Sequence, residues 1–503
     1  MCQSIVDLSH DNCTRMTKTL SMRYWMVLLS LVVGFSATAQ QRVSFGDAQK
    51  MMMERNKAIS SAKYSVDAAY REYRATQGLR MPSVDLVGCY TLMQHSIDID
   101  LGGAKGVVTE SLDGMIKSGV KEGVITPAIA TLLTDGLAPL MGADWRYTLQ
   151  NRHFGFVGTT ITMPIYLGRR IDIASRIAKL KLDNAQIGLN GVQNALVTEL
   201  VERYYGVILA REVAAVKEFV VKGVEQHLHD AETMEEQGAV AHSVVLYLQY
   251  KLSDVERDYS DAVSKLQIAE RALKTTLQSD TDIEPTESMF LLYEIYNIDY
   301  YRDSAVNLNN IIGEVENVER ISAEGVNLAR SAFMPEIVAM GGASLYSYNL
   351  SDMLPRWAVG VGLSMPLFGG LSKQEQYRAS KSVERSVEDM ADKVREDILL
   401  LVDKKYYSLQ NALLNVNSTK RSIAFAESYY TTALEGFREG VTPSSELMDA
   451  RIALAASEVE YLDAVYDYVM SLARLLEVSG LSDEFMEYMS RGVKVDIKNV
   501  INL

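Results

Sequence analysis

The sequence predicts a mainly helical protein with a few β-strands, built from two tandem repeats. Three observations predict this fold class. Nine prolines occur in 503 residues, and the 120 residues between Pro164 and Pro285 contain none. A constant sequence offset relates two long stretches of the chain. The segments ahead of the two longest helical stretches change to a two-residue apolar period, which is typical of strands.

Composition excludes several classes of protein. Apolar residues make up 48% and charged residues 23% of the chain, which is typical of an ordered protein. The formal charge of −15 argues against a nucleic-acid-binding surface. Three cysteines are too few for a disulfide scaffold or a cysteine-based zinc cluster.

The first residues indicate export. Met22-Arg23 precede an apolar run over 25–33, and Ala37-Thr38-Ala39 has the small-residue spacing that a signal peptidase recognises. We therefore expect a signal peptide at 1–39, with Met22 as an alternative start. The run is too short to anchor the protein in a bilayer. A buried first helix is the alternative interpretation.

The repeat defines the expected domains. Met163-Pro164 and Met365-Pro366 differ by 202 positions, and the same offset relates many later pairs. Near the front of each repeat the offset is 253, which indicates an insertion of 51 residues in the first repeat. The first repeat is expected at 40–290, with its insertion at about 98–145. The second repeat is expected at 291–482, and a C-terminal tail at 483–503.

Each repeat is expected to contain one very long antiparallel helical hairpin. Apolar residues at spacings of three and four continue over about 65 residues, which correspond to roughly 100 Å of helix. The expected helices are 169–234 with 244–277, and 372–437 with 446–478.

The turns between these helices carry their own signals. Gly238 and Gly440 suit the left-handed position that follows a helix C-terminus. Ser243 and either Ser444 or Ser445 are expected to cap the returning helices. The apolar stripes along the helices are interpreted first as ordinary helix–helix packing.

Four strands are expected, two ahead of each long helix. Bulky and small residues alternate over Trp357–Met365, and less regularly over 154–163. The partner strands are expected at 83–95 and 336–348. Such alternation is typical of membrane β-strands, although one strand alone fits a soluble hairpin equally well. Four strands are too few to close a barrel, so a membrane location requires oligomerisation.

With these features the chain resembles the TolC family of outer membrane efflux proteins, from about Ser44 to Leu481. The resemblance rests on the duplication, on Pro366-Leu367-Phe368-Gly369-Gly370 before a long helix, and on the tip sequence that runs from Phe437 to Ala450. The first repeat lacks the first glycine of the pattern, and its tip is more apolar.

The resemblance implies a homotrimer whose twelve strands form an outer membrane β-barrel, continued into the periplasm by an α-barrel. It implies a passive exit duct of a tripartite efflux pump or a type I secretion system. The implied partners are outer membrane lipid, a periplasmic adaptor and an inner-membrane transporter of the RND, ABC or MFS type. On this topology the insertion lies outside the cell, where we expect it to narrow or cover the barrel mouth.

The resemblance also implies two functional surfaces. Glu446 and Asp449 share a helix face and would form a ring of carboxylates at the periplasmic gate. The alternative interpretation is that these two carboxylates only stabilise the N-terminus of the returning helix, by interacting with its dipole. The adaptor is expected to dock on the hairpin tips, at Gly238, Ala239, Val240, Ser243, Gly440, Val441, Thr442 and Ser445.

No catalytic, cofactor or metal site is predicted. No nucleotide-binding or hydrolase motif stands at a strand-turn-helix position, and His227 and His229 are too close in sequence to share a helix face. The chain is therefore not expected to be an enzyme. The alternative function is a soluble periplasmic coiled-coil adaptor or scaffold, which the paired strands fit less easily.

Overall fold

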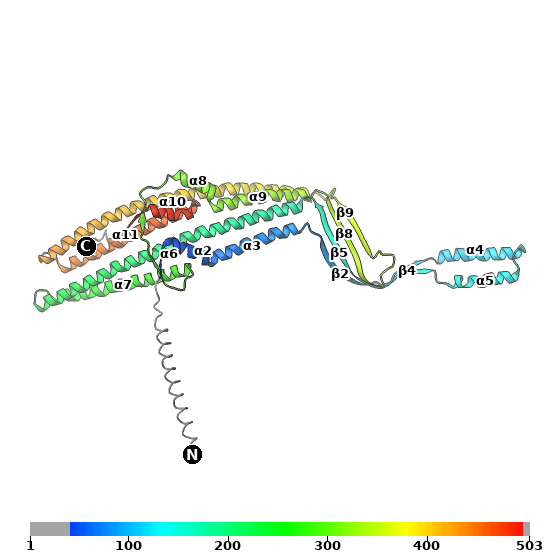
Figure 1. The fold of residues 1–503 in the computed structure, drawn as a ribbon, viewed down its shortest axis with the longest axis horizontal. Helices are drawn as coiled ribbons and strands as arrows, with labels where there is room; N and C mark the ends of the chain where they lie inside the picture. The colour runs from blue at the N-terminus through cyan, green and yellow to red at the C-terminus, as the bar shows by residue number, and fades with distance from the viewer. Residues whose placement is uncertain (1–40, 496–503) are drawn as a thin grey trace, which may run out of the picture. The chain divides into compact units, whose positions relative to one another are not determined.

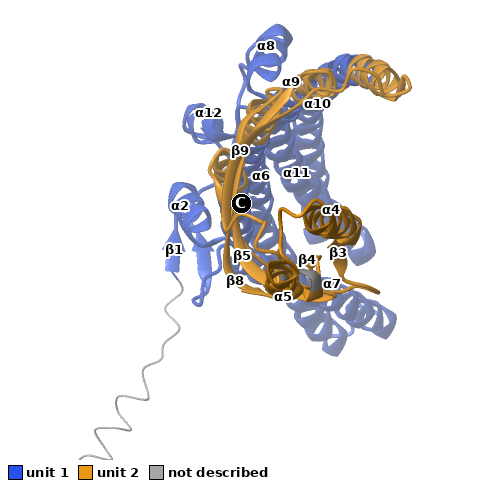
Figure 2. Cartoon of the chain, turned by 90° about the vertical axis from the view of Figure 1, so that its right-hand side faces the viewer, with its two compact units in different colours: residues 1–69, 181–319, 386–503 blue, residues 70–180, 320–385 orange. Residues whose placement is uncertain are grey.

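The computed structural model describes residues 41–495, so the expected signal peptide and the last eight residues of the expected tail lie outside it. The chain divides into two compact units, and each takes segments from both repeats (Figure 2). Unit 1 comprises 1–69, 181–319 and 386–503, and unit 2 comprises 70–180 and 320–385.

Unit 2 contains a four-stranded antiparallel sheet (Figure 1). Its order is β2-β5-β8-β9, so the central pair joins the two repeats. The strands are β2 (Ser83–Leu92), β5 (His153–Leu167), β8 (Glu336–Tyr348) and β9 (Trp357–Ser364). All four predicted strands are therefore present, and β2 and β9 each have one side without a partner strand among residues 41–495.

The pairing register separates two chemically different faces. Val84 pairs with Ile161, which pairs with Gly341, and Gly341 pairs with Val359. Directly paired residues point to the same side of a sheet, so this face collects the bulky apolar side chains. The neighbouring row, from Asp85 through β5 and β8 to Ala358, is polar or small.

The expected insertion is an ordered helical hairpin. Strands β3 (Ile97–Asp100) and β4 (Arg146–Gln150) pair antiparallel and lead into α4 (Gly102–Lys121) and α5 (Pro127–Gly142). No helix was predicted for this segment, which contains several glycines and two prolines. Pro127 lies in the first turn of α5, where its missing N–H costs nothing, and it therefore favours the helix.

Unit 1 contains most of the two long hairpins, which confirm the predicted helices to within two residues at each end. Their bounds are α6 (Arg170–Glu236), α7 (His242–Thr276), α10 (Ser372–Arg438) and α11 (Ser444–Val478). The first residues of α6 and α10 belong to unit 2. Within residues 41–495, none of the helices combines the length and apolar character needed to cross a membrane.

Four shorter helices repeat at the same 253-residue offset found in the sequence. Helices α2 (Phe45–Arg55) and α3 (Lys57–Gly78) correspond residue for residue to α8 (Ile298–Leu308) and α9 (Asn310–Ser331). Asn297 caps α8 as Ser44 caps α2, each through a side-chain oxygen. The duplication therefore includes local capping as well as helix length.

The core of unit 1 is aromatic. Tyr204 and Tyr205 of α6 are fully buried, and Phe45 packs edge-on against Tyr204 at 5.4 Å between ring centres. The Tyr204 hydroxyl donates to the Val43 carbonyl at 2.9 Å, so this buried polar group is satisfied. Strand β1 (Gln41–Val43) is held beside β6 (Ile283–Pro285) in parallel.

Part of the expected C-terminal tail packs on this core. It forms α12 (Phe485–Arg491) and β10 (Val493–Lys494), and β10 pairs antiparallel with β7 (Phe290–Leu291). Phe485 and Tyr488 are buried.

Candidate functional site

The two hairpin tips have closely similar backbone turns. Gly238 and Gly440 have φ values of +72° and +74°, the left-handed conformation that was predicted for them. In each turn the residue after the glycine donates its N–H back to a carbonyl in the last helical turn, Ala239 to Met234 and Val441 to Gly436, at 2.8 Å. No heavy atom would meet a Cβ at either glycine, so each is required for its backbone conformation and not for space.

The predicted serine caps are wrong. Helix α7 begins at His242 after Ala241, and α11 begins at Ser444 after Pro443, and no side chain caps either helix. Pro443 already has the extended conformation of an N-cap residue, so the helix starts two residues earlier than expected. Ser243 and Ser445 are consequently exposed on the tips.

The structure presents most of the predicted docking residues at the tip surfaces. All eight are exposed except Val240 and Thr442, which are half-buried. Thr442 packs against Gly436, where any Cβ would overlap its hydroxyl. The second tip is therefore held in shape by a contact across its own turn.

The predicted acidic pair lies on an exposed face of α11. Glu446 and Asp449 are exposed, while Leu447 and Met448 between them are buried. The Nζ of Lys251, on α7, lies 3.8 Å from an Asp449 carboxylate oxygen and 5.7 Å from the centre of the Tyr247 ring. Lys251 was not predicted as a site residue. It lies one helical turn beyond Tyr247, which is the first-repeat position equivalent to Asp449.

An arginine links the two hairpins further along α11. The Arg451 guanidinium donates to the Phe219 carbonyl of α6 at 3.1 Å and to the Tyr430 hydroxyl of α10 at 3.3 Å. It also lies 4.9 Å from the Phe219 ring centre and 5.9 Å from that of Tyr430. Gly223 makes this possible, because a Cβ there would overlap the guanidinium carbon. We refer to these four residues as the Arg451 clamp.

A buried carboxyl group lies two turns beyond the clamp. Glu458 is 7% exposed. The pKa of Glu458 is raised to about 7, chiefly by burial and also by the negative charge of Glu427 on α10, while the positive charge of Arg451 opposes the rise. A charge here is therefore disfavoured, and the residue titrates near neutral pH.

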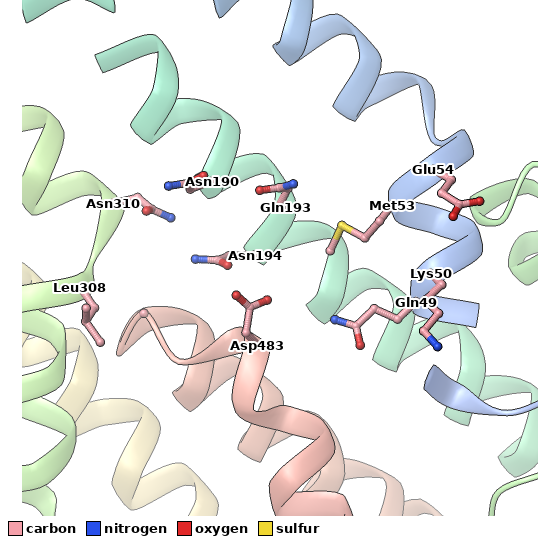
Figure 3. A pocket seen from close by; sticks show the side chains of 11 residues that line it. Gln49, Lys50, Met53, Glu54, Asn190, Gln193, Asn194, Leu308, Asn310 and Asp483 are labelled. Atoms are coloured by element: carbon pink, nitrogen blue, oxygen red, sulfur yellow. The ribbon is translucent and has the colours of Figure 1, made fainter. Parts of the chain in front are cut away.

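Unit 1 also contains a polar pocket of about 610 Å³. Figure 3 shows Asn194 of α6 nearest to Asp483, which lies in the short helix η1 (Ser482–Glu484), and Asn190 of α6 beside Asn310. Among residues 41–495, no three histidine, cysteine, aspartate or glutamate side chains gather as a metal site.

A family model described as outer membrane efflux protein matches residues 317–481. Over 302 residues the chain is 24% identical to the alkaline protease secretion protein AprF of Pseudomonas aeruginosa, covering 58% of this chain and 62% of that relative. By these comparisons the chain is similar to outer membrane efflux proteins of the TolC family.

Further comparisons agree with this family. The chain is 24% identical over 193 residues to the outer membrane protein TolC of Vibrio cholerae, covering 35% of this chain and 42% of TolC. Both alignments span less than two thirds of the relative's length.

Two solved structures share the fold. A membrane protein from Pseudomonas aeruginosa superposes with a TM-score of 0.67 at 15% identity, covering 87% of this chain and 90% of its own. The outer membrane channel CmeC of Campylobacter jejuni superposes with a TM-score of 0.64 at 12% identity, covering 89% of this chain and 88% of the CmeC chain. The predicted fold class is confirmed.

Proposed function

We propose that this chain is one subunit of a trimeric exit duct in the outer membrane. The duct conducts substrates passively when a periplasmic adaptor and an inner-membrane transporter of the RND, ABC or MFS type engage it. The observation that carries this proposal is the sheet, which has free edges at β2 and β9 and one apolar face. Free edges cannot face hydrocarbon, and three copies joined edge to edge remove them.

The two faces of the sheet support the same function. On the apolar face Val359 is 78% exposed and Leu86 is 71% exposed in the single chain. A soluble scaffold would leave this surface in water, whereas in a membrane barrel it contacts lipid. The polar face then lines the lumen. The test is extraction: the protein should require detergent, and its mass in detergent should correspond to three chains. A water-soluble monomer would support the scaffold instead.

We further propose that Glu446 and Asp449 form a cation-binding gate at the periplasmic entrance. Three copies bring six carboxylates together, and a ring of carboxylates attracts cations. Lys251 beside Asp449 reduces the local negative charge. Glu446→Gln with Asp449→Asn should therefore weaken channel block by divalent and trivalent cations, and Lys251→Met should strengthen it.

A matched control for the gate is Glu439→Gln, which removes an exposed carboxylate from the same tip. Block is measured in planar bilayers as the cation concentration that halves the conductance. Equal block in the double variant and in the Glu439→Gln control would contradict the carboxylate ring.

The adaptor is proposed to dock on the tips, where the two glycine turns expose backbone and small side chains. A photo-crosslinking residue at Val441, which is 79% exposed, should capture the adaptor in intact cells. The same residue at Val383, exposed on α10 in unit 2, serves as the control. Crosslinks to the adaptor that are equally strong at both positions would contradict docking on the tips.

A further inference from the structure

The α4–α5 hairpin carries an apolar stripe that the rest of residues 41–495 leaves uncovered. Ile129, Leu132 and Leu133 of α5 follow the spacing i, i+3, i+4, so they lie on one side of the helix, and their exposures are 52%, 75% and 42%. On α4, Val108 and Met115 are seven residues apart and share a face, and Met115 is 71% exposed. We call these five residues the hairpin stripe.

The hairpin itself is well formed. Ile125 packs against Gly119 where the chain turns between the two helices, and at the base the Lys105 ammonium donates to the Ala143 carbonyl at 2.6 Å. Two helices can nevertheless cover only one face of each other. In its 16 residues α5 has a single charged side chain, Asp135, and it lies off the stripe.

The position of the hairpin favours other copies of this chain as the partner. Viewed along the sheet, α4 and α5 lie on the concave side of its curve, all within unit 2 (Figure 2). If three such sheets close into a barrel, the concave sides face a common axis and bring the three hairpins together. Because the barrel tethers them, their effective concentration is high and a small apolar contact suffices.

We propose that the hairpin stripe packs against the hairpins of two further copies of this chain, forming a helical bundle over the barrel mouth. This inference rests on the proposed trimeric duct and names a contact within it. The bundle narrows the opening that the strands enclose, and it buries side chains that would otherwise be exposed to water outside the cell.

The test uses single cysteines in the full-length, membrane-extracted protein. Cys2→Ser, Cys13→Ser and Cys89→Ser remove the three cysteines of the sequence. Leu132→Cys then places a thiol on the hairpin stripe, and Thr131→Cys places one on the opposite, exposed side of α5 as the control. We expect Leu132→Cys to form covalent dimers under mild oxidation, and to react about tenfold more slowly than Thr131→Cys with a membrane-impermeant maleimide.

Two other results would overturn the inference, and they are distinguishable. If the protein is a trimer but both thiols react equally fast and neither forms dimers, the stripe is open to solvent, lipid or another protein, and the bundle does not exist. If the protein is a water-soluble monomer, the proposed duct fails as well. As a second variant, deletion of residues 102–142 should raise single-channel conductance, and unchanged conductance would contradict the bundle.

Discussion

The Arg451 clamp offers the sharpest test of how the two hairpins are held together near their tips. Gly223→Ala places a methyl group where the Arg451 guanidinium lies, so the arginine has to leave. It then loses its hydrogen bonds to the Phe219 carbonyl and the Tyr430 hydroxyl and its contacts with both rings. Alanine is otherwise favoured over glycine within a helix, so any destabilisation has to come from the lost clamp.

The magnitude follows from these contacts. Net of hydration, a hydrogen bond from a charged donor contributes about 1.5–3 kcal/mol and a ring contact at a partly exposed site about 0.5–1 kcal/mol. The displaced group is the end of a flexible side chain, so it re-forms part of these contacts after it moves. Alanine returns about 0.5–1 kcal/mol of helix propensity. We therefore expect a net loss of about 2 kcal/mol, which corresponds to a roughly 30-fold change in the ratio of tips with the clamp formed to tips with it released.

The assay is single-channel open probability in planar bilayers, with thermal unfolding measured alongside. The matched control is Gly206→Ala on the same helix, where the nearest atom to the new methyl is the Tyr466 hydroxyl at 3.9 Å. Gly223→Ala should open more often than the control. If the two variants open equally often and unfold at the same temperature, the clamp does not hold the tip.

Two further predictions concern stability. The folded pKa of Glu458 lies near 7, above its ordinary value, so its stabilising contribution is complete below about pH 4.5 and is lost as pH rises through 7. Glu458→Gln should remove this loss, so that the unfolding temperature changes less between pH 5 and 8. Glu427→Gln should lower the pH at which half of the stabilisation is lost. If the unfolding temperature depends on pH equally in the wild type and both variants, Glu458 is not the titrating group. Gly440→Ala should lower the free energy of unfolding by about 1–2 kcal/mol because the φ of Gly440 is positive. The control Gly114→Ala, in α4 with open space around it, should raise the free energy of unfolding by about 0.5–1 kcal/mol. Equal effects of the two substitutions in a denaturant titration would contradict the left-handed turn.

The sequence was sufficient for the repeats, the strands and the long helices, because each leaves a periodic pattern in one stretch of chain. Alternation located β9, and spacings of three and four located α6, despite its glycines. The glycine turns at the tips were also predictable, since only backbone conformation decides them.

Side-chain contacts between distant segments were not predictable. Arg451 and Gly223 are 228 positions apart, and nothing near either residue indicates the other. Lys251 similarly belongs to the repeat that lacks the acidic pair. The helices of the insertion were missed for a different reason: glycines and prolines are usually read as helix breakers, but here Pro127 occupies a first turn and Gly119 makes room for Ile125.

The central claim is that three copies of this sheet close into one conducting barrel. Its most direct test is planar-bilayer conductance of the detergent-extracted protein, with its mass in detergent determined on the same sample. The account predicts three chains per particle and stable, cation-selective conductance steps. A particle of one chain, or a trimer that inserts without conducting even after Gly223→Ala, would contradict it.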